Sequence, residues 1–490
     1  MINRKFLQSS FIYTFSSALP LASALVLLPF YYNMLALSLV GLLALYISFT
    51  ALIQIIANFG LDAYIGISYF HNNHDKELLK KHIGSIIGYL SVLGILLIVI
   101  WALIGSTVFR SVFGTNGMVF YPFGFISIIT AICNSFFKTY SNLLINQQKP
   151  VRFFVVNLAN FFMTTLFSIG ALYLFPNSLT GPLWGRLLSG IGILIIALVS
   201  FHREFGIRVS FDRDKLKRIF SIVFPITLFF LLIWTSSYID RFIINYFLQQ
   251  TDIALFDFGI KCTLLIEFLH NGLSSSIMPK VYSIVKENGI AASTPEINKY
   301  FSALSAIMII VIPINYLVIP YIVPFIVLKT EVYKSFVLLP ILSMSFFSRP
   351  LYSFYLMPIY YFEKTRKLPW VLLKSTAIQI GLIILGVRYF GTMGAAIAFM
   401  LSGFIQIYFL KLESQKVFRF TFNHKKMIYL PLIYIAISLA IEIIAVKFQL
   451  PFLRFTEFFI ALAMVFYLYK AEIVVVFKLF YEKLGITSRT

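Results

Sequence analysis

Long apolar runs alternate with short polar gaps along nearly the whole chain. A run of about 20 apolar residues is long enough to cross the hydrocarbon core as a helix. No segment alternates with period two over strand-length stretches, so a transmembrane β-barrel is excluded. The pattern predicts an all-α polytopic membrane protein with about fourteen transmembrane helices, at 11–32, 36–61, 84–107, 121–144, 153–174, 180–201, 219–248, 253–279, 301–328, 336–361, 369–388, 392–411, 428–446 and 455–477.

Composition excludes a water-soluble fold. Hydrophobic residues make up 60% of the 490 residues and charged residues 12%, against roughly 45–50% and 25% in soluble domains. Cys133 and Cys262 both fall inside apolar runs, so neither a disulfide framework nor a metal-binding spacing is expected. Because Gly-rich phosphate loops, nucleophile elbows and zinc-helix motifs are absent from the sequence, we expect no catalytic residue, metal or cofactor, and no enzyme.

Two short polar motifs are better explained by local structure than by catalysis. The Asp-Arg-Asp stretch at 212–214 resembles a metal–nucleotide-sugar motif. It lies in a short basic gap without an α/β domain, so we expect it to cap the lead-in to the next helix. His71 and His74 with Asp75 have a spacing that a metal could use, but their short polar loop favours a solvated turn.

The basic residues predict the orientation in the membrane. The chain has 40 Lys and Arg against 19 Asp and Glu, a net charge of +21. In a soluble protein this excess would suggest nucleic acid, but here the basic residues sit in the gaps between helices and no nucleic-acid partner is expected. A cytoplasmic N-terminus leaves only six on the opposite side: Arg110, Lys329, Lys334, Arg388, Lys447 and Arg454. Both termini are therefore predicted to be cytoplasmic. The run at 11–32 is expected to be a retained helix rather than a secretion signal.

Weak internal repeats predict two lobes. Pro20 in the first helix corresponds to Pro225 in the seventh, and Gly181 with Ser189-Gly190 corresponds to Gly394 with Ser402-Gly403. We expect a six-helix lobe at 1–201, a basic cytoplasmic linker at 202–218, a second six-helix lobe at 219–412, and an additional helix pair with the C-terminus at 413–490.

Four stretches, taken in order, carry a family resemblance. The seventh helix has Pro225-Ile226 and then Tyr-Ile-Asp-Arg-Phe-Ile-Ile at 238–244, followed by Asn245 where the family pattern has Gly. The next helix has Phe256 and Lys261, with Ala254 in place of a usual Gly. Phe-Gly-Leu-Asp-Ala at 59–63 and Phe-Gly-Thr-Met-Gly-Ala-Ala-Ile-Ala at 390–398 complete the set. These stretches resemble the multidrug/oligosaccharidyl-lipid/polysaccharide (MOP) exporter superfamily, and within it the Wzx-type polysaccharide flippases.

The resemblance implies a function. Members of the family alternately open a central cavity to each membrane face and move undecaprenyl-pyrophosphate-linked oligosaccharide across the cytoplasmic (inner) membrane for O-antigen, capsule or related surface polysaccharide. It also implies membrane lipid, a polysaccharide polymerase and a chain-length regulator as partners. A polytopic polymerase or lipid-sugar transferase remains an alternative, although the opposite-side gaps are short. A drug/cation antiporter or a peptidoglycan-precursor (lipid II) flippase of the same superfamily is another.

Charged residues inside the predicted helices are the candidate site. A charge at the bilayer centre costs about 2.5–3.5 kcal/mol, so it usually faces protein or a wet cavity. If the cargo is a lipid pyrophosphate, spaced cations can hold its phosphate oxygens. Ion pairing between helices, or reaching to the surface in the case of Lys138, is the competing role. The candidate pyrophosphate-binding cations are Arg349, Arg186, Lys138 and Lys261.

Acidic residues in the same helices have other expected roles. Asp240, Arg241 and Asp257 are predicted to form a structural or gating network, in which Lys261 lies one turn after Asp257. Glu267, midway along its helix, is a candidate for ion coupling, because a carboxylate at that depth can take up a proton. A satisfied structural carboxylate is the alternative for Glu267.

Overall fold

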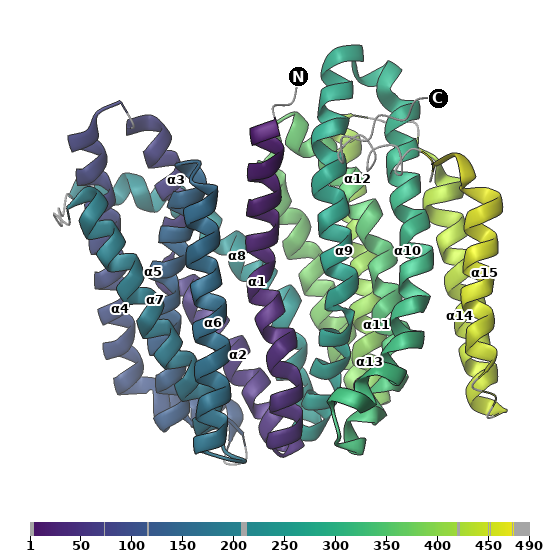
Figure 1. Ribbon diagram of the computed structural model, residues 1–490, viewed down its shortest axis with the longest axis horizontal. Helices are drawn as coiled ribbons and strands as arrows, with labels where there is room; N and C mark the ends of the chain where they lie inside the picture. The colour runs from purple at the N-terminus through teal and green to yellow at the C-terminus, as the bar shows by residue number, and fades with distance from the viewer. Residues whose placement is uncertain are drawn as a thin grey trace. The chain divides into compact units, whose positions relative to one another are not determined.

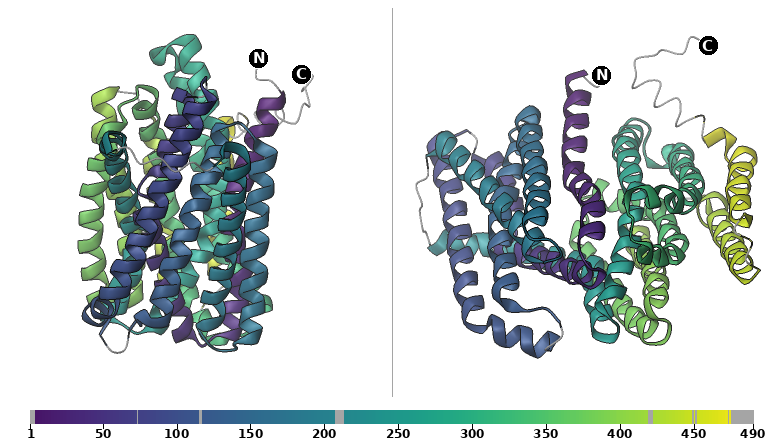
Figure 2. Two further views of the ribbon diagram at one scale, coloured as in Figure 1. Left: turned by 90° about the vertical axis from the view of Figure 1, so that its left-hand side faces the viewer. Right: turned by 60° about the horizontal axis from the view of Figure 1, so that its bottom comes forward.

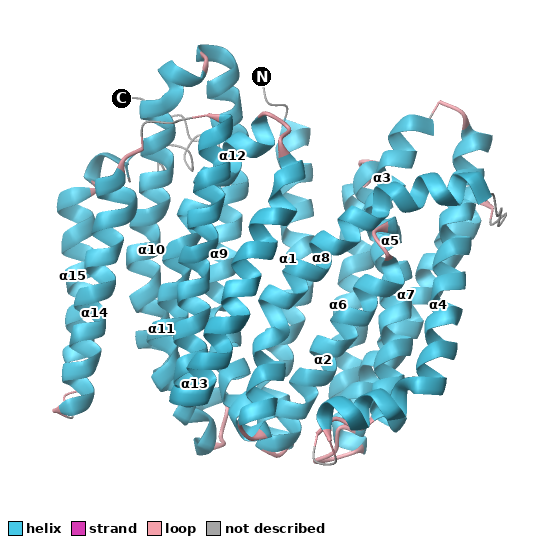
Figure 3. Cartoon of the chain, turned by 180° about the vertical axis from the view of Figure 1, so that it is seen from behind, coloured by secondary structure: helices cyan, strands magenta, loops and turns pink. Residues whose placement is uncertain are grey.

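The computed structural model describes residues 4–72, 74–114, 117–206, 213–418, 422–448, 450, 452–472 and 474. Within these ranges it contains helices and loops and no strand, which confirms the all-α fold class (Figure 3). Residues 207–212 of the expected linker, including Asp212, and residues 475–490 lie outside the described residues. So do the side chains of His71, Arg213 and Asp214.

The helices form two compact units, of which the first comprises Met1–Asp257. Within it α4, α5, α6 and α7 run side by side (Figures 1 and 2). The helices α2 and α3 contact this group, and α8 contacts α2 and α3. The elements of this unit are α1 (Arg4–Met34), α2 (Leu37–Asn58), α3 (Leu61–Asn72), α4 (Lys76–Phe113), the π-helical turn η1 (Phe120–Gly124), α5 (Phe125–Asn146), α6 (Pro150–Leu174), α7 (Thr180–Phe205), α8 (Arg213–Phe247) and the start of α9 (Gln250–Asn288).

The second unit comprises Phe258–Thr490 and begins within α9. The lobe boundaries expected from the sequence remain a prediction. Besides the rest of α9, this unit holds α10 (Ile290–Ile326), the 3-10 turns η2 (Thr330–Leu338), η3 (Ser345–Phe347) and η4 (Thr365–Lys367), α11 (Leu339–Met344), α12 (Ser348–Tyr361), α13 (Leu368–Val417), the π-helical turn η5 (Lys425–Tyr429), α14 (Leu430–Lys447) and α15 (Leu453–Leu468).

Every expected transmembrane segment has a helical counterpart. In the described residues, 11 helical segments are long and apolar enough to cross a membrane. The sequence predicts three more transmembrane helices than this, and each of the three has a reason to be missing from that number. The apolar part of α9 carries Asp257, Lys261 and Glu267, and α15 has only 16 residues. The 50 residues of α13 contain two expected helices, which meet at Gly391 with φ 60° and ψ −143°. That left-handed conformation favours glycine, so the chain turns there.

A bend between α2 and α3 places a polar residue inside the first unit. Phe59 (φ 46°) and Gly60 (φ 70°) adopt left-handed conformations that end α2 and start α3 in a new direction. Gly60 lies against the backbone of Val223 in α8, where a Cβ would meet the carbonyl oxygen at 3.1 Å. The close approach buries the first turn of α3, including Asp62, which is 2% exposed.

The helices α9 and α10 extend beyond the expected membrane segments. The sequence predicts a polar gap at about 280–300, whereas α9 continues to Asn288 and α10 begins at Ile290. With 39 residues, α9 is about 58 Å long at 1.5 Å per residue, well beyond a hydrocarbon core of about 30 Å. Val281, Ile284 and Ile297 in these extensions are buried, which favours an ordered helical structure there. Ser293 Oγ donates to the carbonyl of Ile284 at 3.0 Å across the pair.

Candidate functional site

The predicted Asp240, Arg241 and Asp257 network is a compact ion cluster in the first unit. Arg241 Nη1 lies 2.9 Å from Asp240 Oδ1, and Arg241 Nη2 lies 2.9 Å from Asp257 Oδ1. A further hydrogen bond runs from Arg241 Nε to Asp257 Oδ1 at 3.0 Å. All three side chains are nearly fully buried, with Arg241 5% exposed.

The cluster joins two helices. Asp240 and Arg241 are on α8, and Asp257 is on α9. Arg241 Nη1 also donates to the carbonyl of Ser237 at 2.9 Å, and the guanidinium lies 5.2 Å from the Tyr238 ring centroid. Two acids and one cation held this tightly stabilise the pairing of α8 with α9, because losing one partner would leave a buried charge unpaired.

Lys138 has a buried acidic partner. Lys138 Nζ on α5 lies 3.0 Å from Asp62 Oδ2, with 37% of the lysine side chain exposed and 2% of the aspartate. Asn142 Nδ2 donates to the same oxygen at 3.1 Å. The lysine ammonium also lies 4.7 Å from the Phe230 ring centroid. Lys138 is therefore held inside the unit by an acid and an aromatic ring, while part of its stem remains accessible.

Arg186 presents a cation without an acidic partner. It sits in the second turn of α7 and is half-buried, and its Nε is enclosed without a hydrogen-bond partner. No Asp or Glu of the described residues lies within ion-pair distance of it. The Nε–H of Arg186 is therefore a donor without an acceptor in the described residues, and the guanidinium has hydrogen-bonding capacity left for an anion.

Arg349 follows a break in the helical path of the second unit. The segment from Thr330 to Tyr361 is interrupted by the 3-10 turn at Ser345–Phe347, and Arg349 is the second residue of α12. Short 3-10 stretches within a longer helical segment often mark functional positions. The guanidinium lies 5.5 Å from the Phe346 ring centroid. No acid of the described residues forms an ion pair with it.

His270, on α9, lies near Arg349 of α12. Its buried imidazole has Nδ1 3.5 Å from Asn271 Oδ1 and Nε2 3.2 Å from Ser274 Oγ. Glu267 is half-buried one turn earlier on the same helix and forms no ion pair with Arg349. Lys261 is also half-buried on α9, beside the buried Cys262.

The structure thus brings together some of the predicted residues and leaves others apart. Arg241 meets both predicted acids. Asp62, the partner of Lys138, was noted in the sequence only as part of the 59–63 motif. An acid at the end of an apolar run was the available signal, but its partner lies on a helix much later in the chain. Glu457, a fully buried acid in α15, was also missed.

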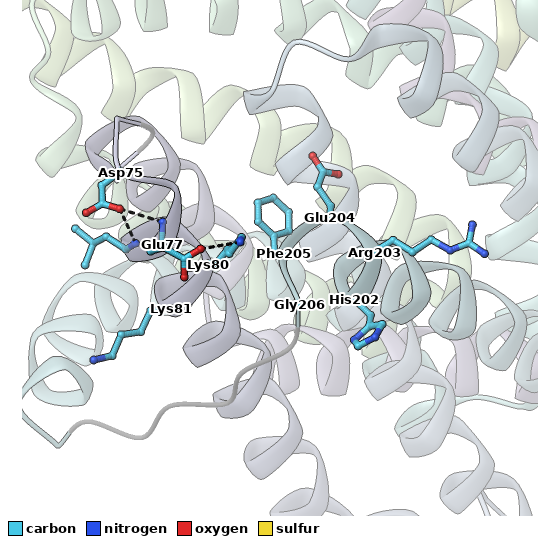
Figure 4. Close-up of a pocket in the computed structure, with 10 residues that line it drawn as sticks. Asp75, Glu77, Lys80, Lys81, His202, Arg203, Glu204, Phe205 and Gly206 are labelled. Carbon is cyan, nitrogen blue, oxygen red and sulfur yellow. Dashed lines mark hydrogen bonds and ion pairs between the residues drawn. The ribbon is translucent and has the colours of Figure 1, made fainter.

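The first unit contains a cavity of about 790 Å³ at the start of α4 and the end of α7 (Figure 4). Its charges largely neutralise one another, since Lys80 pairs with Glu77 at 2.8 Å and Asp75 caps α4. The side chains of Lys81 and Arg203 diverge (Figure 4). The lining residues do not include the predicted cations: they are Asp75, Glu77, Leu78, Lys80, Lys81, His202, Arg203, Glu204, Phe205 and Gly206.

Taken together, these features define a class of protein. The described chain is a multi-pass bundle of apolar helices with cations and acids placed inside its units, and two of those cations have no acidic partner in the described residues. Ionisable residues within membrane helices commonly mark ion or substrate pathways. This arrangement is typical of membrane transporters.

Comparison with protein families gives the membership. A family model described as "Polysaccharide biosynthesis protein" matches residues 6–283, more than half of the chain, and the protein belongs to this family. The family is part of the MOP exporter superfamily, which confirms the resemblance to that superfamily drawn from the sequence. No curated protein matches the chain.

Solved structures share the fold. "Lipid II flippase MurJ, inward closed conformation" superposes with a TM-score of 0.68 at 14% identity, covering 97% of this chain and 99% of that one. The inward-facing conformation of a multidrug resistance MATE family transporter of the MOP superfamily gives 0.65 at 15% identity, covering 82% and 94%. An outward-facing conformation of such a transporter gives 0.58 at 13% identity, covering 84% and 95%.

Proposed function

We propose that this protein is a flippase for undecaprenyl-pyrophosphate-linked oligosaccharides, which it moves across the cytoplasmic membrane for assembly of O-antigen, capsule or a related surface polysaccharide. The protein acts by alternating access and catalyses no covalent step. The membership of the polysaccharide biosynthesis family supports the choice of cargo. A polysaccharide polymerase and a chain-length regulator are its proposed partners on the route to the finished polymer.

The observation that carries the proposal is the state of Arg349. A guanidinium within a membrane segment is expensive unless a countercharge accompanies it, and no described acid supplies one. A lipid pyrophosphate would supply the countercharge transiently and could bind the planar guanidinium through two oxygens. Arg186, which also lacks an acidic partner, and Lys261 are proposed as further contacts for the anion.

Lys138 has a different proposed part. Because Asp62 already neutralises it, a pyrophosphate would have to compete with this acid for the ammonium. Exchange of this kind keeps binding weak enough for release, which transport requires. Lys138 is thus proposed to bind the anion weakly and briefly during transport, whereas Arg349 and Arg186 are the primary anion contacts.

A reconstituted flipping assay tests the proposed function. The full-length protein in vesicles should move a fluorescent undecaprenyl-pyrophosphate-linked oligosaccharide from the inner to the outer leaflet, where an impermeant quencher reaches it. Protein-free vesicles provide the baseline, and undecaprenyl phosphate bearing no sugar tests the need for the glycan. Quenching no faster than in protein-free vesicles would contradict the proposal.

In the same vesicles a proton gradient tests the coupling role of Glu267. Glu267→Gln should make the rate of transport insensitive to the gradient, because the amide cannot take up a proton.

The proposed orientation makes a separate prediction. With both termini cytoplasmic, single cysteines at Asn177 and Gln250 should react with an impermeant maleimide in intact cells, and one at Asn288 should react only after lysis. The buried native thiols Cys133 and Cys262 keep the background low. Labelling of Asn288→Cys in intact cells would reverse the orientation.

Transport of lipid II is a second candidate that one observation favours. The superposition on the lipid II flippase MurJ covers 97% of this chain, whereas that on the inward-facing multidrug transporter covers 82%. Replacing the labelled oligosaccharide by labelled lipid II in the flipping assay separates the two cargoes, because the proposed flippase should favour the former.

A further inference from the structure

A buried polar cluster attaches the helix pair α14–α15 to α10. These helices lie in the second unit, and α15 contacts both others (Figure 1). Glu457 on α15 is 0% exposed. Its Oε2 is hydrogen-bonded to the hydroxyl of Tyr316 on α10 and to that of Ser438 on α14, and these two hydroxyls lie 2.9 Å apart. We call these three oxygens the Glu457 triangle.

The triangle contains no cation. No Lys, Arg or His of the described residues forms an ion pair with Glu457, and Arg454 on the same helix pairs instead with Glu442 at 3.0 Å. The second carboxyl oxygen of Glu457, Oε1, is enclosed without a hydrogen-bond partner. An ionised carboxylate in this position would be a buried and uncompensated charge, which costs several kcal/mol.

Counting hydrogens favours the protonated state of the carboxyl group. The triangle has three oxygen–oxygen contacts, and a closed ring of hydrogen bonds needs one hydrogen for each. The hydroxyls of Tyr316 and Ser438 supply two. A protonated Glu457 supplies the third, so that each group donates once around the ring. An ionised carboxylate leaves one contact without a hydrogen and Oε1 as an orphaned charged oxygen.

We propose that Glu457 is a proton-binding site and that its bound proton stabilises the packing of the α14–α15 pair against α10. The proton binds to the Oε2 atom and is donated to a neighbouring hydroxyl of the triangle. On release, the carboxylate gains a charge that the surrounding apolar helices do not solvate, and the attachment of the pair weakens. This site is separate from the anion contacts proposed for transport and does not depend on the identity of the cargo.

The ligand set favours a proton over a divalent metal ion. Ca²⁺ takes 6–8 oxygen ligands and Mg²⁺ needs an octahedral set. The described cluster offers the two carboxyl oxygens and two hydroxyls. Tyr434 Oη, which donates to the backbone oxygen of Glu457 at 3.3 Å, adds one more hydroxyl, and the set still falls short of six oxygens.

The other ionisable groups around the triangle are known. Besides Tyr316, which belongs to the triangle, they are in the described residues Tyr434 and Glu442 from α14 and Arg454 from α15 itself. Tyrosine hydroxyls ordinarily titrate near pH 10. Glu442 and Arg454 are paired with each other, so Glu457 is the acid of this group that lacks a countercharge.

Melting experiments on the purified full-length protein test the proposal. Between pH 6 and pH 9 the melting temperature of the wild type should fall by several degrees, because proton loss introduces the buried charge. Glu457→Gln keeps the shape of the neutral carboxyl group and cannot ionise, so its melting temperature should stay level over this range. The control Glu472→Gln removes a different buried acid, which pairs with Lys426 and does not face the triangle, and it should retain the pH dependence of the wild type.

Infrared spectroscopy gives a second readout, which reports the protonation of the carboxyl group directly. The wild type at pH 7 should show a carboxylic-acid C=O band that disappears at high pH in step with the fall in melting temperature, and Glu457→Gln should lack it. Absence of this band, or equal pH dependence in wild type and Glu457→Gln, would overturn the proposal. Stabilisation of the wild type by sodium at constant pH, lost in Glu457→Gln, would assign the site to a metal cation and overturn it as well.

Discussion

Replacing Arg349 with alanine should lower the rate of lipid-linked oligosaccharide transport by about 10- to 100-fold, since hydrogen bonds to a charged group contribute about 1.5–3 kcal/mol. The substitution removes both the charge and the planar fork that binds phosphate oxygens. Expression should be unchanged, because no described acid is left unpaired. Transport is measured in the reconstituted flipping assay and as surface-polysaccharide display in complemented cells.

Two further variants sharpen the test. Arg349→Lys keeps a point charge and should retain part of the transport, because lysine binds phosphate without the bidentate geometry. Arg388 is an exposed arginine of α13, placed over the ring of Tyr389 rather than at an acid. Arg388→Ala is therefore the matched control and should transport normally. Full transport by Arg349→Ala at normal expression would end its assignment as an anion contact.

A structural role for Arg349 makes a different prediction. If it joined helices through Glu267, each single substitution would lower the melting temperature, and the double substitution would lower it by less than the sum. The structure shows no ion pair between these residues. We therefore expect the melting temperatures of Arg349→Ala and Glu267→Gln to stay close to that of the wild type.

The second large effect is expected at Arg241. Arg241→Leu should destabilise the fold by about 3–5 kcal/mol, because Asp240 and Asp257 are left buried without their cation. The expected result is a lower melting temperature in detergent and a smaller fraction of monodisperse protein. Asp240→Asn and Asp257→Asn added to Arg241→Leu should recover much of this loss, since the triple variant buries no charge. An unchanged melting temperature for Arg241→Leu would contradict the structural role.

The surface provides the control for this prediction. Lys80 and Glu77 form an ion pair on α4 with side chains 42% and 76% exposed. Exposed pairs contribute about 0–1 kcal/mol, so Lys80→Met should change little. Transport per folded protein then separates a structural from a gating role for the Arg241 cluster: the structural role lowers the amount of folded protein, whereas the gating role lowers the rate of each molecule.

The helices were predictable because membrane insertion depends on a local property. Each span needs a long enough apolar run, and the turn at Gly391 is marked by a glycine in a short gap. The helical extensions around residues 280–300 were not predicted. Outside the bilayer an apolar run is no longer required, and a few buried residues such as Ile284 and Ile297 are enough to keep a helical pair together.

The candidate site was less accessible to sequence reasoning because charge pairing is not local. Arg241 and Asp257 lie on consecutive helices, and their association was anticipated. Lys138 and Asp62 lie on α5 and α3, and no periodicity in the sequence connects them. Whether a charged side chain is paired depends on which helices pack together, and apolar patterns alone do not determine that packing.

The Arg241 cluster also has a consequence for how the chain enters the membrane. α8 carries Asp240 and Arg241 in its apolar portion. Asp240 pairs with Nη1 of Arg241, but Nη2 has its acidic partner only when Asp257 of α9 has been synthesised and has packed against α8. On insertion scales a charge costs at most about 2.5–3.5 kcal/mol, the value at the helix centre, and less near the end of α8, where Asp240 and Arg241 lie. α9, with Asp257, Lys261 and Glu267, is itself a poor candidate for solitary insertion. During synthesis α8 should therefore wait beside the translocation channel and partition into lipid together with α9, as one hairpin.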